Sequence, residues 1–179
     1  MEQDNRSVID YYKYWKDEAI KADLDTKRHN FSILISNKLK DFNASTVIRN
    51  ANAFLAKEVI IYGRKKWDRR GAIGTHNYTN FKYVKTEEEL SDAIGDELVI
   101  GVDNINNAKR METYNWPSVH FIVAFGQEDI GLPQELIDRC KDLVYISQYG
   151  STRSLNVGCA SAITMYDIVR KGINVISYK

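Results

Sequence analysis

Short apolar runs alternate with helical patterns along most of the chain, and this alternation limits the possible folds more than any other feature. Five runs predict buried strands because turn-forming polar residues flank them: FSILIS (31–36), EVIIY (58–62), LVIGV (98–102), HFIVAF (120–125) and LVYIS (143–147). Helical patterns cover 45–56, 86–94, 133–140 and 155–171. The runs are apolar on both faces, as parallel strands beneath helices are. We therefore predict an α/β fold with a mainly parallel sheet flanked by helices.

The first thirty residues predict a helical extension before the first strand. Ser7 and Asp10 resemble a capping box, and Val8, Tyr12, Trp15, Ala19 and Ala22 follow at spacings of four and three. The opposite face is charged, and such faces more often meet water than RNA. With 179 residues the chain fits a single domain, divided here into the extension (1–30) and a core (31–171).

Composition excludes several classes of protein. A net charge of +1 does not indicate a polyanionic partner, so any nucleic-acid surface must come from local clustering of charge. Cys140 and Cys159 lie outside any CxxC spacing, which argues against a disulfide framework and a zinc site, and we expect no metal. The N-terminus lacks the apolar core of a signal peptide, and no apolar run approaches the ~20 residues of a membrane helix. We expect a cytoplasmic protein with no membrane association.

One short stretch, 62–76 (YGRKKWDRRGAIGTH), concentrates positive charge around Trp67. Basic side chains interleaved with an aromatic ring suit phosphate neutralisation and base stacking, which looped or single-stranded RNA requires. The alternative is a solvated surface loop with a partly buried tryptophan. The candidate RNA-binding residues, called the basic segment below, are Arg64, Lys65, Lys66, Arg69 and Arg70.

Two polar loops follow the last two predicted strands, where open parallel sheets bind ligands. The first, 126–133, offers two glycines and Glu128; the second, 148–158, runs into a helix at Ser154 and Asn156. Taken singly, Ser154 and Glu128 suit helix capping better than chemistry. Neither loop matches GxGxxG, and no GK[ST] ends a glycine loop, so a Rossmann dinucleotide site and a P-loop are excluded.

Three segments together resemble the motifs of the SpoU (TrmH-like) branch of the SPOUT methyltransferases, in the family's order. They are NASTVIRNANAF (43–54), FGQEDIGLP (125–133) and ISQYGSTRSLNVGCASAI (146–163). The SLNV core of the third is the family's most distinctive string. The resemblance covers about 31–169 and leaves the N-terminal extension unexplained.

The resemblance implies an S-adenosylmethionine-dependent RNA 2'-O-ribose methyltransferase that forms a homodimer. It also implies a deep trefoil knot over about 98–171, which no composition or periodicity predicts. By position, the cofactor-binding groups lie around Val102, Asp103, Gly126, Ile146 and Leu155. The implied catalytic residues are Arg49, Asn43, Glu128, Ser154 and Asn156. Arg49 would lie beside the 2'-hydroxyl and the neighbouring phosphate. Because a guanidinium stays protonated, bidentate phosphate clamping is its safer role, and it acts as a base only if RNA binding perturbs it.

The chain departs from the family pattern at three places. Ser147-Gln148 stands where the family usually has proline and methionine, Leu55 replaces a small residue, and Gly158-Cys159 replaces a serine-valine type pair. None of these is a proposed catalytic position. Two alternatives stay open: a catalytically inactive knotted RNA-binding partner protein, and an α/β enzyme acting on a small nucleotide. Because the chain has only the short extension before its first strand, we expect tRNA rather than rRNA as substrate.

Overall fold

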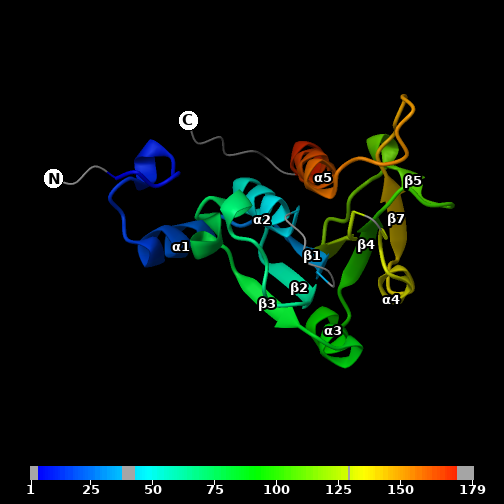
Figure 1. Cartoon of the computed structure of the whole chain (residues 1–179), viewed down its shortest axis with the longest axis horizontal. Helices are drawn as coiled ribbons and strands as arrows, with labels where there is room; N and C mark the ends of the chain where they lie inside the picture. Colours follow the sequence, from blue (N-terminus) through cyan, green and yellow to red (C-terminus); the bar gives the residue numbers. More distant parts are fainter. Residues whose placement is uncertain (1–3, 38–42, 129, 173–179) are drawn as a thin grey trace.

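The computed structural model describes residues 4–37, 43–128 and 130–172. Its seven strands form one sheet in the order β3-β2-β1-β6-β4-β7-β5, and every neighbouring pair is parallel (Figure 1). The strands are β1 (Phe31–Asn37), β2 (Val59–Gly63), β3 (Phe81–Val84), β4 (Leu98–Val102), β5 (Lys109–Arg110), β6 (Phe121–Phe125) and β7 (Asp142–Tyr145). The predicted α/β class with a mainly parallel sheet is confirmed.

Helices cover both faces of the sheet (Figure 1). Because side chains alternate along a strand, Ile33 belongs to a core cluster with Val47 of α2 (Asn43–Ala53) and Ile168 of α5 (Val157–Gly172). Leu34, the next residue, packs in a second cluster with Leu90 of α3 (Glu87–Ile94) and with α4 (Gln134–Ile137). All seven residues of β1 are buried, which explains why four of them are apolar and why none is charged; the three polar ones are Ser32, Ser36 and Asn37.

Two strands, β3 and β5, do not coincide with an apolar run and were therefore not predicted from the sequence. β3 pairs only with β2 and leaves Lys82 and Tyr83 exposed, and both residues of β5 are exposed. Both strands lie at the edges of the sheet, where one side of the strand needs no partner and helices cover less of its faces. Edge strands therefore carry mixed sequences that periodicity does not detect.

Helix ends differ from the predicted ones by a few residues. α2 stops at Ala53 because Leu55 adopts a left-handed φ of 52°, which ends the helix before residue 56. α4 spans only four residues of the predicted 133–140, and Pro133 precedes it as N-cap. α3 begins as predicted, with the Thr86 hydroxyl accepting a hydrogen bond from the Glu89 amide. No helix in the part of the chain that the structure describes is long and apolar enough to cross a membrane.

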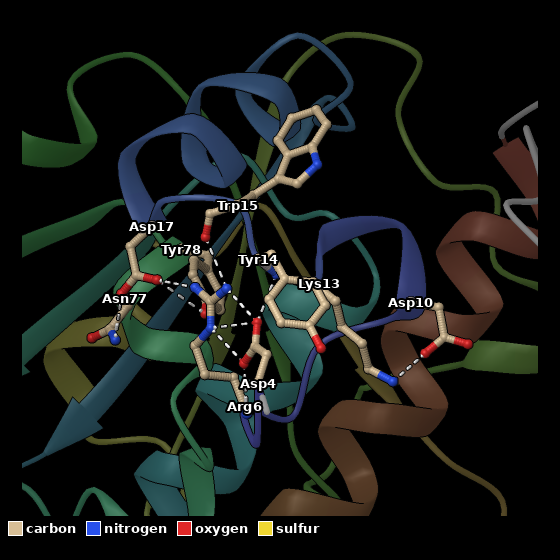
Figure 2. A network of polar contacts seen from close by, with 9 residues as sticks. All are labelled: Asp4, Arg6, Asp10, Lys13, Tyr14, Trp15, Asp17, Asn77 and Tyr78. Atoms are coloured by element: carbon tan, nitrogen blue, oxygen red, sulfur yellow. Dashed lines mark hydrogen bonds and ion pairs between the residues drawn. The ribbon is translucent and has the colours of Figure 1, made fainter. Parts of the chain in front are cut away.

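The prediction of one continuous N-terminal helix is wrong. A 3-10 turn (Asp10–Tyr12) and α1 (Asp17–Asp25) are separated by a break at Tyr14, whose φ is 66°. The cause is a polar network around Arg6, shown in Figure 2. Arg6 donates to the Asp4 and Asp17 carboxylates and to the Trp15 carbonyl, and the Tyr14 amide donates to Asp4. These contacts occupy backbone groups that a continuous helix would bond internally.

The N-terminal segment is fastened to the body of the protein through the same network. Asn77 donates to the Asp17 carboxylate, and Tyr12, Ile20 and Tyr78 form a small core cluster of their own. Asn77 and Tyr78 belong to a 3-10 turn (Thr75–Tyr78) that follows the basic segment. The predicted extension therefore packs on the core, although its residues 1–3 lie outside the described part of the chain.

The end of α5 is anchored by Asp167, which is 7% exposed. Its carboxylate accepts a hydrogen bond from Trp116 Nε1 at 2.9 Å and forms ion pairs with Arg170 at 2.6 Å and Lys171 at 2.8 Å. Lys171 also donates to the carbonyls of Met111 and Tyr114. Burial alone would raise the pKa of Asp167, but the contacts with Lys171, Trp116 and Arg170 hold this pKa below its usual value.

We expect Asp167→Asn to lower the free energy of unfolding by about 1–3 kcal/mol at neutral pH, because two cations lose their counter-charge. A carboxyl whose pKa falls on folding stabilises the protein above its unfolded pKa of about 3.9 and loses that contribution as the pH drops through the folded value. The deficit of the variant should therefore shrink at pH 3. Urea unfolding at pH 7 and pH 3 measures it, with the exposed Asp138→Asn as control. An equal deficit at both pH values would contradict this account.

Candidate active site

Three loops meet at the carboxyl edge of the sheet, after β4, β6 and β7. Val102 pairs in register with both Phe125 and Val144, so these strands end at the same level. This edge is where parallel α/β sheets bind their ligands. The loops are residues 103–108, 126–133 and 146–156, and the last of them leads directly into α5. Asp129, within the second loop, lies outside the described residues.

A pocket opens between these loops. All five positions predicted to surround the cofactor line it, and Glu128 and Ser154 of the predicted catalytic set line it as well. The complete lining is Val102, Asp103, Asn104, Phe125, Gly126, Gln127, Glu128, Gly131, Ile146, Gln148, Ser154, Leu155, Val157 and Ala160. The structure thus brings together residues that are up to 58 positions apart, from Val102 to Ala160.

The loop after β6 is a tight turn that requires both of its glycines. Gln127 and Gly131 exchange backbone hydrogen bonds of 3.1 and 2.8 Å, which brings the two ends of the turn together. A Cβ on Gly126 would lie 2.0 Å from the Gly131 carbonyl carbon, and Gly131 itself has a φ of 65°. The Asp103 side chain stabilises the turn, because its Oδ2 accepts a hydrogen bond from the Leu132 amide at 2.7 Å. The Asp103 carboxylate is therefore a structural group.

Three predicted catalytic side chains form a closed polar ring beside the pocket. Asn43 Nδ2 donates to Glu128 Oε2 at 2.6 Å, and Asn156 Nδ2 donates both to Glu128 Oε1 at 3.0 Å and to Asn43 Oδ1 at 2.8 Å. The ring joins the first residue of α2, the loop after β6 and the residue before α5. Glu128 and Asn156 are exposed and Asn43 is half-buried, so a large substrate can reach the ring.

Ser154 does not cap α5, because the cap is Asn156, and Glu128 does not cap α4, whose N-cap Pro133 makes no side-chain cap hydrogen bond. Asn156 Oδ1 accepts hydrogen bonds from the amides of Gly158 at 2.9 Å and Cys159 at 3.3 Å, which caps α5. This explains why α5 begins at Val157 rather than at Leu155 as predicted. Ser154 is exposed at the rim of the pocket and outside the ring. Asn156 therefore serves two purposes, as a cap through its oxygen and as a ring member through its nitrogen.

Arg49 lies on the exposed side of α2, away from the pocket lining. Within the described residues, no hydrogen bond or ion pair engages its guanidinium, which leaves its fork open to an outside anion. The helix beneath it is fixed, because the next residue, Asn50, donates to the Gly158 carbonyl at 2.8 Å and to Ser161 Oγ at 2.9 Å. Asn50 thus ties α2 to α5, a contact that the sequence did not reveal.

The basic segment leaves the carboxyl end of β2, and all five of its basic side chains are exposed. Trp67 is partly buried against the core, in edge contact with His76 and tilted against Phe81, so its ring serves packing. Asn37 Nδ2 supports the backbone by donating to the Arg64 carbonyl at 2.6 Å.

The basic side chains differ in their contacts within the protein. Arg70 is paired with Asp68 at 2.6 Å, and Lys65 lies over the Tyr83 ring at 4.9 Å. A groove beside the segment includes Lys85. Lys85 was not among the predicted RNA-binding residues, because β3, which precedes it, was not predicted. Gln127, Gln148 and Asn104 of the pocket were also missed, and their position after strand ends was the available signal.

Comparison with known proteins identifies related chains. A model of the "SpoU rRNA Methylase family" matches residues 30–166. The chain is 25% identical over 163 residues to the tRNA (guanosine(18)-2'-O)-methyltransferase of Escherichia coli K12, covering 87% of this chain and 69% of that protein.

Solved structures agree in fold. An AdoMet-bound rRNA methyltransferase from Sinorhizobium meliloti superposes with a TM-score of 0.70 at 22% identity, covering 82% of this chain and 59% of that one. A TrmH/SpoU tRNA modifying enzyme of A. aeolicus gives a TM-score of 0.73 at 18% identity, with coverages of 87% and 81%. The chain thus spans less than two thirds of the length of the Sinorhizobium protein.

Proposed function

The chain belongs to the SpoU rRNA methylase family, and on that premise we propose that it transfers a methyl group from S-adenosylmethionine to a ribose 2'-hydroxyl of RNA. The observation that carries the proposal is the ring of Asn43, Glu128 and Asn156 beside a pocket lined by all five expected cofactor positions. Three segments that are distant in sequence, the start of α2 and the loops after β6 and β7, converge there on one polar centre.

The pocket residues suit the cofactor. Val102, Ile146 and Leu155 offer apolar surface, while the turn after β6, closed by the backbone hydrogen bonds between Gln127 and Gly131, forms a fixed wall of the pocket. When bound, the cofactor supplies a methyl group activated by the adjoining sulfonium charge. The protein has then to align the acceptor hydroxyl, which loses its proton to solvent or to a nearby base as its oxygen takes the methyl group and S-adenosylhomocysteine leaves, and to exclude competing water.

We propose that the ring holds the side chains of the site in position and that Arg49 binds the RNA. Each oxygen of Glu128 accepts an amide hydrogen, so the carboxylate holds Asn43 and Asn156 in place. The open guanidinium of Arg49 suits bidentate clamping of the phosphate next to the acceptor ribose. Ser154 is exposed and belongs to the pocket lining, so we assign it a contact with the acceptor nucleotide.

We further propose that the substrate is tRNA and that the enzyme works as a cytoplasmic homodimer. The names of the Escherichia coli and A. aeolicus relatives support a tRNA substrate. The proposed organisation is a single domain, with the extension at 1–30, the catalytic core at 31–171 and a trefoil knot over about 98–171. No metal enters this mechanism.

Calorimetric titration with S-adenosylmethionine tests the first half of the proposal. We expect saturable binding of the cofactor, weakened when Gly126 is replaced by alanine, because a Cβ there would collide with the Gly131 backbone. The absence of binding by the wild-type protein would instead favour a catalytically inactive RNA-binding partner protein.

The basic segment is expected to contact the RNA backbone. Lys65→Gln combined with Lys66→Gln should weaken tRNA binding roughly tenfold at 0.1 M salt, and should reduce the slope of log K against log salt by about 1.4 if both lysines meet phosphates of a single-stranded region. Filter binding over a salt series measures both quantities.

The matched control removes the same charge at the opposite edge of the sheet. Lys57 and Lys141 are exposed at the amino ends of β2 and β7, far from the strand ends that carry the pocket. Lys57→Gln with Lys141→Gln should leave the slope unchanged. Equal effects of the two double variants would mean that net charge alone, and not the basic segment, governs RNA binding.

A further inference from the structure

The pocket is lined by two glutamines whose buried polar atoms have no hydrogen-bond partner. Gln127 is 4% exposed, and neither its Nε2 nor its Oε1 is paired; Gln148 Oε1 is likewise buried and unpaired. Both residues line the pocket. Buried polar atoms in proteins are nearly always paired, because an unpaired one has lost its bonds to water without replacement. Unpaired atoms in a ligand pocket therefore indicate that the ligand provides the partner.

Both side chains are carried on fixed backbone. The amide and carbonyl of Gln127 are bonded to Gly131, at 3.1 and 2.8 Å, so its side chain starts from a defined point of the turn after β6. Gln148 follows β7, and the amide of the residue before it, Ser147, donates to Glu112 Oε1 at 3.2 Å. Such preorganisation is what side chains that select a ligand require.

In the described part of the chain, the other buried polar atoms without a partner belong to residues that do not line this pocket. Asn37 Oδ1, for example, belongs to a residue whose Nδ2 already supports the basic segment, and Asn37 is not among the residues that line the pocket. Gln127 and Gln148 come from two different loops and share one cavity.

We propose that Gln127 and Gln148 select the cofactor through hydrogen bonds to its polar groups. Gln148 Oε1 accepts an N–H or O–H of the cofactor, and the Gln127 amide, which presents a donor and an acceptor side by side, pairs with a group that offers the complementary pair. The adenine edge, with an amino group beside a ring nitrogen, has this complement for Gln127. The inference rests on the proposed function, since it concerns the same pocket.

The test replaces each amide with a side chain of similar length that cannot form strong hydrogen bonds. Gln127→Met and Gln148→Met should each raise the Kd for S-adenosylmethionine and for S-adenosylhomocysteine about tenfold in calorimetry. The melting temperature of the cofactor-free variants should be unchanged or higher, because an unpaired buried amide has been removed. Gln134→Met is the matched control, since Gln134 is exposed on α4 and bonded to Asp138.

A cofactor analogue with inosine in place of adenosine locates the contact. It should bind wild type about tenfold more weakly than S-adenosylmethionine, whereas Gln127→Met should no longer distinguish the two. Unchanged Kd values in both methionine variants, or a lowered melting temperature with an unchanged Kd, would overturn the inference while leaving the proposed function intact. Failure of the wild-type protein to bind any of these ligands would instead overturn the proposed function.

Discussion

Arg49→Ala is expected to abolish methyl transfer to RNA, with a loss of at least about 100-fold in turnover, while the Kd for S-adenosylmethionine changes less than twofold. Arg49 is exposed on α2 outside the pocket lining, so its removal should leave the cofactor site intact. Its guanidinium is unengaged by the described residues, and its loss removes the clamp that we assign to the phosphate beside the acceptor ribose. Single-turnover rates and calorimetry on the same preparation measure the two quantities.

Arg49→Lys separates charge from geometry at this position. Lysine keeps the positive charge but not the planar fork, so it should recover RNA binding without recovering most of the rate. Neither substitution should alter the melting temperature by more than 1–2 °C, roughly what a surface change produces. Near wild-type turnover in Arg49→Ala would remove Arg49 from the mechanism.

Asn156→Ala is expected to damage stability and activity together. It removes the cap of α5 and two of the three hydrogen bonds of the polar ring. Loss of such a cap costs about 1–2 kcal/mol of folding free energy. Glu128 and Asn43 also lose their hydrogen bonds to Asn156 and are no longer held in position, so turnover should fall on the order of 100-fold. Thermal melting and single-turnover rates provide the measurements.

Asn156→Asp distinguishes the two roles of this residue. Aspartate keeps an oxygen for the amides of Gly158 and Cys159, but it lacks the Nδ2 donor and places a negative charge beside Glu128. It should therefore retain most of the helix cap and still lose activity. A substitution to alanine that is neutral in both melting and rate would contradict the assignment of Asn156 to the ring.

The sequence predicts the interior of this fold better than its margins. A strand that is buried on both faces, such as β6, is apolar throughout and appears in the sequence as an unbroken apolar run, and the buried β1 interrupts its run only with uncharged residues. β3 and β5 lie at the edges and lack that constraint. The break at Tyr14 depends on where the Arg6 side chain reaches, which no local pattern encodes.

The candidate site shows the same division. Positions around the pocket followed from strand ends and from family motifs, but the pairing of Asn43 with Glu128 and Asn156 depends on how the start of α2 meets the loops after β6 and β7. The local sequence does not identify the cap of α5, because Ser154 and Asn156 are both good capping residues. The structure shows that the cap is Asn156 and not Ser154 as predicted. Gln127 and Gln148 became candidates only once their burial without partners was visible.

Mapping the methylated position on RNA tests the central claim most directly. Total RNA or tRNA incubated with the protein and S-adenosylmethionine carrying an isotope-labelled methyl group is digested to nucleosides and analysed by mass spectrometry. We predict that the label appears on the ribose as a 2'-O-methylnucleoside, that it is found at a defined position in tRNA, and that it is absent with Arg49→Ala. Label on a base, or no label in RNA despite cofactor binding, would contradict the assignment of this protein as an RNA 2'-O-ribose methyltransferase.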